Sequence, residues 1–147
     1  MEKSIGRELH SVCNLIMRYT NNNPSSSRQS SSMTGTNGWI ISFLLKNDGR
    51  DVFQKDLEQA FSITRSTASK VVDLMEKKGL VQRCRVSRDG RLRKLVLTEK
   101  ARSLGQHVRD NSQTVEQKLT AGFSSEELDT LYSYLERLKG NLAAAEK

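Results

Sequence analysis

Long hydrophobic runs, aromatic residues and chain breakers are all scarce in this sequence. Its 147 residues contain no run of the about 18 apolar residues that a membrane span needs. The N-terminus has no apolar core of the signal-peptide kind, so we expect a cytoplasmic protein with no membrane partner. Aromatics make up only 5% of the chain and there is one proline, which favours a mainly helical fold.

Cysteine and catalytic motifs are scarce as well. The two cysteines, Cys13 and Cys84, are expected to be free thiols in the cytosol. The sequence has no G-x-S-x-G, no glycine-rich phosphate loop and no H-E-x-x-H, so we expect neither an enzyme nor a bound cofactor. His10 and Cys13 form an H-x-x-C pair with His107 as a remote third group. This spacing falls short of a metal site, and we predict none.

Positive charge is concentrated in one segment. Between Thr64 and Arg102 there are twelve basic and four acidic residues, an excess of eight, whereas the whole chain carries +7. The remainder therefore sums to −1. Such a segment is typical of a surface that faces a polyanion, and a merely well-solvated face is the alternative that charge alone leaves open.

Hydrophobic periodicity predicts helices at both ends of the chain. Residues 5–20 place apolar side chains on one stripe, and residues 24–37 read as a polar loop rich in serine. Residues 39–46 are so apolar that we expect a buried helix. After Thr98, which caps a helix to about residue 121, Ser124 begins a capping box and a helix with leucines at 3-4-3-4 spacing.

The centre of the chain predicts a helix-turn-helix followed by a hairpin. Residues 54–61 form a short helix, and Thr64 caps a second helix that ends near Lys78, before Gly79. Two strand-like runs, 80–86 and 92–97, then flank the Asp89-Gly90 pair. We therefore expect a mainly α fold with a small β-hairpin wing, which is a winged helix-turn-helix, together with a helical dimerisation region.

This arrangement suits duplex DNA, because the major groove admits one helix. Arg91 is expected in the minor groove, where negative potential is concentrated. Two interpretations of Asp89 remain open: it holds the Arg91 side chain, or it forms the turn. The predicted DNA-binding residues lie on the second helix and the wing tip: Arg65, Ser66, Thr67, Ser69, Lys70, Arg88, Asp89 and Arg91.

These segments resemble the MarR family of winged-helix regulators over essentially the whole chain. The resemblance rests on residues 64–83 and on Asp89-Gly90-Arg91 followed by 95–101. It departs from the family at Ser62, where a turn glycine is frequent, and at Ala101. It implies one domain over 1–147, with the winged helix at 38–98 and dimerisation helices at 1–20 and 99–147.

The resemblance also implies a function. We expect a homodimeric transcriptional repressor that reads a pseudo-palindromic operator and is released by a small aromatic ligand or by an oxidant acting on Cys13 or Cys84. For each cysteine, an inert structural thiol is the alternative. The competing function is a winged-helix adaptor for proteins or RNA, in which Lys70 and Arg91 are dispensable.

Overall fold

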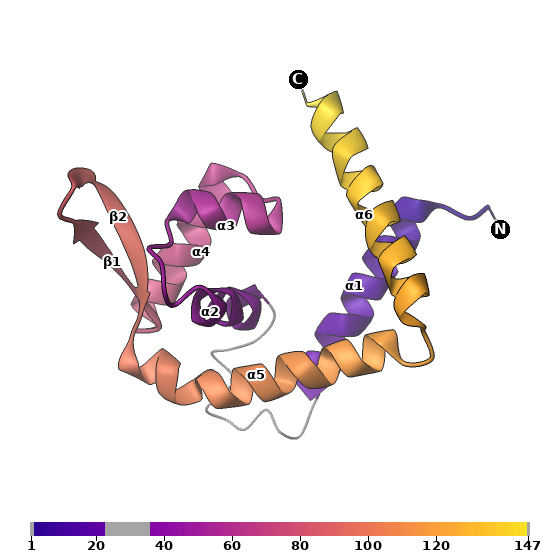
Figure 1. Cartoon of the computed structure of the whole chain (residues 1–147), viewed down its shortest axis with the longest axis horizontal. Coiled ribbons are helices and arrows are strands. Elements are labelled where there is room, and N and C mark those ends of the chain that lie inside the picture. Colours follow the sequence, from indigo (N-terminus) through magenta and orange to yellow (C-terminus); the bar gives the residue numbers. More distant parts are fainter. Residues whose placement is uncertain (1, 23–35, 147) are drawn as a thin grey trace. The chain divides into compact units, whose positions relative to one another are not determined.

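The structure is a computed structural model that describes residues 2–22 and 36–146 (Figure 1). Its contacts divide the chain into two compact units, Met1–Val115 and Glu116–Lys147. Of the predicted loop 24–37, residues 24–35 lie outside the described part, and residues 36 and 37 already belong to a helix. Within the described part, no helix has the length and apolar character needed to cross a membrane.

Six helices and one hairpin are described, so the predicted fold class, mainly α with a two-stranded wing, is confirmed. Residues 54–61 and the helix capped by Thr64 fall where the sequence predicts them. The elements are α1 (Ile5–Asn22), α2 (Thr36–Lys46), α3 (Gln54–Phe61), α4 (Arg65–Lys77), β1 (Val81–Val86), β2 (Asp89–Leu97), α5 (Glu99–Thr120) and α6 (Ser125–Ala145).

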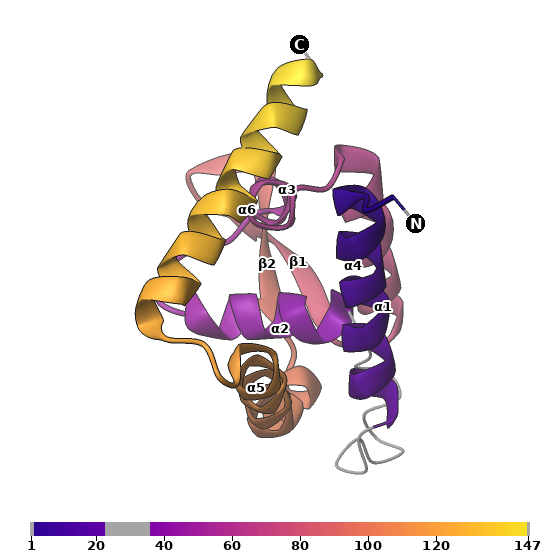
Figure 2. The same cartoon turned by 90° about the vertical axis from the view of Figure 1, so that its right-hand side faces the viewer.

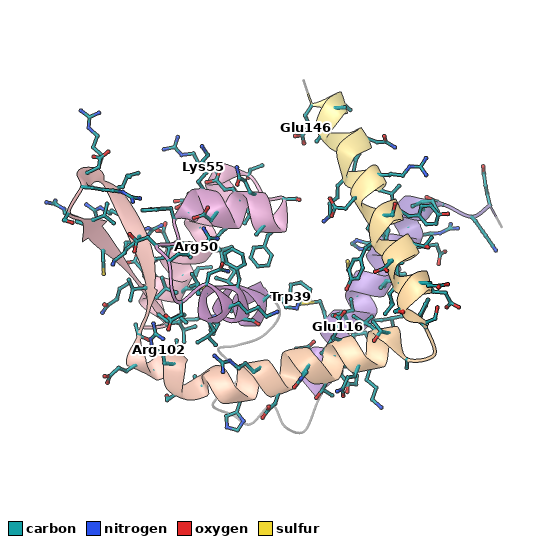
Figure 3. The ribbon with its side chains drawn as sticks, viewed as in Figure 1. Trp39, Arg50, Lys55, Arg102, Glu116 and Glu146 are labelled. Carbon is teal, nitrogen blue, oxygen red and sulfur yellow. The ribbon has the colours of Figure 1, made fainter. Side chains whose placement is uncertain are left out.

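The core of the first unit is built around α2, which crosses the base of the hairpin (Figure 2). Ile40 and Ile41 are buried there, so the expectation of a buried helix is confirmed for the centre of α2. Trp39 is different, because it is 42% exposed. Its position is about half a turn away from the buried stripe, and it projects from α2 on the side away from the hairpin (Figure 3).

The hairpin is anchored at its base, and its second strand is exposed at the far end. Its strands pair antiparallel, with Val81 opposite Leu97, and both residues are buried. The Leu95 N–H also donates to the Val52 carbonyl at 2.7 Å, which ties the loop before α3 to β2. In contrast, β2 is exposed from residue 89 to residue 93. The tip half of β2 is therefore exposed, although Val86 at the tip end of β1 is buried.

A second tie joins the start of α5 to the end of α4. Gly79 adopts φ 72°, a left-handed conformation that suits glycine and stops the helix as predicted. The Thr98 hydroxyl accepts the Ala101 N–H at 3.2 Å and donates to the Gly79 carbonyl at 2.6 Å. The predicted cap of this helix is thus confirmed, and it also fixes the hairpin ends.

The second unit consists of the end of α5 and helix α6. Ser124 caps α6 by accepting the Glu127 N–H at 3.1 Å, as the capping-box pattern predicts. The leucine stripe behaves differently from the core stripes, because no residue of α6 is buried. Leu131 is 42% exposed and Leu142 is 71% exposed.

Candidate nucleic-acid interface

The turn between α3 and α4 sets the direction of α4. Leu57 anchors α3 in the core with 0% exposure. Ser62 follows α3 with φ 53° and ψ 45°, a left-handed conformation that disfavours residues with a Cβ by about 1–2 kcal/mol. This is the position where the sequence departs from the frequent glycine. The serine keeps the turn geometry at the expense of local strain.

The N-terminal turn of α4 carries a cluster of hydroxyl groups. The Thr64 hydroxyl accepts the Thr67 N–H at 3.2 Å and donates to the Thr67 hydroxyl at 2.9 Å. The Ser66 hydroxyl lies 3.3 Å from the Thr64 hydroxyl. These bonds hold the first turn in place and leave acceptor and donor capacity on its outer side.

Helix α4 has distinct buried and exposed faces. Ala68, Val72 and Met75 are buried against the core. The predicted DNA-binding residues of this helix lie outside that stripe: Arg65, Ser66, Thr67 and Lys70 are exposed, and Ser69 is half-buried. The structure therefore presents these side chains together on one accessible helix.

The hairpin tip differs from the sequence prediction. The chain turns at Ser87 and Arg88, and Val86 pairs with Asp89, because a register shift falls between Arg85 and Val86. Gly90 lies inside β2, and positive φ in the described residues is confined to Ser62, Gly79 and Gly122. The Asp-Gly pair is therefore not a type I′ turn, which would need positive φ at both central residues.

Asp89 and Arg88 have specific partners at this tip. The Asp89 carboxylate accepts the backbone N–H of Arg91 at 2.9 Å. Of the two interpretations of Asp89, this contact favours turn formation, because the bond is to the backbone and leaves the Arg91 guanidinium unheld. The Arg88 guanidinium lies over the Phe53 ring, 5.6 Å from its centre. The wing tip is thus braced against the start of α3.

Several cations on α4 and the wing have no anionic partner. Within residues 2–22 and 36–146, their charged groups make neither an ion pair nor a hydrogen bond, and all of them are exposed. They are Arg65, Lys70 and Lys77 on α4, and Arg85, Arg91 and Arg93 on the hairpin. Charges left in this state favour a polyanionic partner.

Other cations of the same segment are already neutralised. Arg102 donates two hydrogen bonds to Asp48, at 2.7 and 3.2 Å, and these bonds hold the pKa of the Asp48 carboxyl below its ordinary value. Figure 3 places Arg102 at the start of α5, away from the wing tip. Lys94 lies 3.5 Å from Asp51.

Arg83 differs from these cations because it contacts two carboxylates. Its guanidinium, with a side chain 20% exposed, reaches Asp73 at 2.7 Å and also contacts Glu76. Burial lowers the pKa of Arg83, but the hydrogen bonds to Asp73 and Glu76 outweigh it and raise the pKa. Sequence reasoning counted Arg83 as part of the charge excess and missed these contacts, because a charge count treats every cation alike.

Sequence reasoning counted Arg85 and Arg93 in the charge excess but did not name them, or Lys55, as DNA-binding residues. Lys55 lies in the first turn of α3 and points outward from it (Figure 3). Arg85 and Arg93 face each other across the hairpin as register partners. Strand alternation could not have identified Arg85 and Arg93, because by a period of two they share a face with the buried residues Val81 and Leu95.

The cysteines lie apart from this surface in different environments. Cys13 is exposed on α1 and Cys84 is half-buried in β1, and both are free thiols as expected. Cys84 pairs in register with Lys94 across the hairpin. In the described part of the chain, no group of three or more histidine, cysteine or acidic side chains is placed to hold a metal ion.

Comparison with known proteins identifies relatives of this fold. Residues 31–92 match the sequence profile of the MarR family. YybA of Bacillus subtilis (strain 168), named as an uncharacterized HTH-type transcriptional regulator, is 23% identical over 107 residues, which are 73% of this chain and 71% of that protein. The transcription regulator MarR from Oenococcus oeni PSU-1 is 29% identical with a TM-score of 0.77, over 93% of this chain and 99% of that one. MepR of S. aureus, solved as a DNA complex, has a TM-score of 0.79 at 18% identity, over 95% of this chain and 96% of that one, and it supports the fold.

Proposed function

We propose, from the premise that this chain belongs to the MarR family of transcription regulators, that it binds double-stranded DNA sequence-specifically as a homodimer. One observation carries the proposal: the exposed cations that have no anionic partner among the described residues lie on two elements that contact each other, α4 and the hairpin. The S. aureus relative was solved with DNA, which agrees with this use of the fold.

The proposed binding mode places α4 in the major groove. A groove about 12 Å wide accepts a single helix. Lys70 can donate to guanine acceptors or to phosphate, while Ser66 and Thr67 can donate or accept and so fix the register. The wing would then reach the adjacent minor groove with Arg91, which has no anionic partner in the described residues to compete with the phosphates.

A homodimer is proposed because apolar side chains remain exposed on two helices. On α1, Ile5 is 63% exposed and Leu15 is 56% exposed. On α6, Leu142 is 71% exposed. A second copy of the chain would cover such surfaces at a two-fold axis, and the two α4 helices would then read half-sites about one helical turn apart.

We further propose that the dimer represses transcription and is released by a small aromatic ligand or by oxidation of a cysteine. Repression needs only that the bound dimer occupies promoter DNA. Cys13 is the more accessible thiol, since it is exposed whereas Cys84 is half-buried. Peroxide should weaken DNA binding of the native protein and not of a Cys13→Ser, Cys84→Ser variant. If both respond equally, the oxidant route is wrong.

Selection of bound duplexes from a random pool tests the function itself. We expect a pseudo-palindromic consensus, with an affinity that falls about a thousandfold between 50 and 200 mM salt. Selection of single-stranded RNA in preference to duplex DNA, or of no nucleic acid at all, would favour the adaptor function instead.

A further inference from the structure

Arg83 joins the recognition helix to the wing. It lies on β1, and its guanidinium donates to two carboxylates of α4, those of Asp73 at 2.7 Å and of Glu76. The same guanidinium reaches the Ser69 carbonyl at 3.5 Å. One side chain of the hairpin thus contacts residues on three successive turns of α4.

We propose that Arg83 is a positioning residue for DNA binding, which fixes the wing relative to α4 and covers the carboxylates of Asp73 and Glu76. The proposal rests on the DNA-binding function proposed above. Arg83 itself is not expected to touch DNA, because both of its terminal guanidinium nitrogens already donate to groups of α4 and its side chain is only 20% exposed.

The need for such a residue follows from the packing of the hairpin. Its base is fixed by buried residues such as Val81 and Leu97, but β2 is exposed from residue 89 to residue 93, where Arg91 lies. Arg88 braces the tip against Phe53, before α3, but a small rotation of the ribbon toward or away from α4 would still move Arg91 relative to that helix. Arg83 is two residues beyond Val81 on β1, so its bonds to α4 oppose that rotation.

The charges on α4 give Arg83 its second role. Lys70, Asp73 and Lys77 lie at i, i+3 and i+7, on one exposed face of the helix. The Asp73 side chain is 55% exposed and the Glu76 side chain is 37% exposed. Without a counterion, both carboxylates would stand beside the phosphates of bound DNA, and like charges in an interface strongly oppose binding. Arg83 supplies that counterion from the wing.

Residual dipolar couplings of the backbone amides test the attachment in the DNA-free protein. In the native protein, couplings from α4 and from the two strands should fit one alignment tensor. In Arg83→Gln, the strands should need a separate tensor of smaller magnitude. Arg102→Gln is the matched control, because it also breaks an arginine–carboxylate pair but one that does not join β1 to α4. If Arg83→Gln still fits one tensor, the proposal is overturned.

Binding to the selected duplex tests the consequence for DNA. Arg83→Gln should weaken binding about tenfold, and Arg102→Gln should stay within about twofold. Because Arg83 acts through the wing, Arg91→Ala should cost less in the Arg83→Gln background than in the native protein. Additive effects would overturn the positioning role. If the native protein binds no duplex, the proposed function fails, whereas the couplings still report whether Arg83 holds the wing.

Discussion

Helices α4 and α6 carry apolar stripes of similar regularity, yet the α4 stripe is buried and the α6 stripe is not. In α4, Ala68, Val72 and Met75 are buried within the first unit. In α6, no residue is buried, and Leu131 and Leu142 remain exposed. The first stripe is buried in the chain's own core, whereas the second is the surface on which we propose that a second copy packs. A periodic stripe therefore predicts burial without saying which chain provides it.

Truncation of the α4 stripe should have the largest effect on the stability of the fold. Met75 has 0% exposure, so Met75→Ala should lower the free energy of unfolding by about 2–5 kcal/mol in a urea titration. Its neighbour Leu74 is 54% exposed, and Leu74→Ala should change that free energy by no more than about 0.5 kcal/mol. Equal losses in the two variants would show that burial of the α4 stripe does not determine the stability of the fold.

A charge on the α6 stripe should instead act on association. Leu131→Asp places a carboxylate in the expected dimer surface, and the dissociation constant of the dimer should rise about a hundredfold in sedimentation experiments. Ser133 lies on the opposite side of α6 and is exposed, so Ser133→Asp is the control and should leave the dimer intact. A native protein that sediments as a monomer would refute the dimer.

Replacing Ser62, in the turn before α4, by glycine should stabilise the fold. Ser62 has φ 53°, which glycine adopts without strain. Ser62→Gly should therefore raise the free energy of unfolding by about 0.5–1 kcal/mol, since the relieved strain is offset in part by the extra freedom of glycine when unfolded. Ser62→Ala keeps the Cβ and should give no such gain. Thermal unfolding of the two variants checks the prediction.

Removing the ion pair between Asp48 and Arg102 should have the smallest effect on stability, and that effect should depend on pH. The pKa of Asp48 is lowered in the folded state, so its contribution to stability is present above the pKa of the unfolded carboxyl and is lost as pH falls through the folded pKa. The Tm difference between the native protein and Asp48→Asn should thus be present near neutral pH and vanish in acid. A difference that grows in acid would contradict this sign.

Most helix bounds could be predicted because they depend on local patterns. Thr64 and Ser124 accept the N–H groups that their positions predict, and Gly79 ends α4. The apolar residues 39–46 form a buried helix as predicted. Which side of that helix faces the core depends on tertiary packing, and Trp39 is left exposed.

The candidate site was only partly predictable for a similar reason. The exposed cations of α4 follow from helical phase. The engagement of Arg83 by Asp73 and Glu76 depends on how β1 docks on α4, and no local pattern specifies that docking. The shift of the hairpin turn to residues 87 and 88 likewise follows from the register of two strands rather than from the Asp-Gly pair.

The affinity of the selected duplex for Lys70→Ala and Arg91→Ala tests the central claim most directly. Lys139→Ala serves as the control, since Lys139 is paired with Glu136 on α6. We predict that each of the first two variants binds more weakly by about 1–3 kcal/mol, and that the control binds like the native protein. Unchanged affinity in both Lys70→Ala and Arg91→Ala would contradict the proposal that α4 and the wing bind DNA.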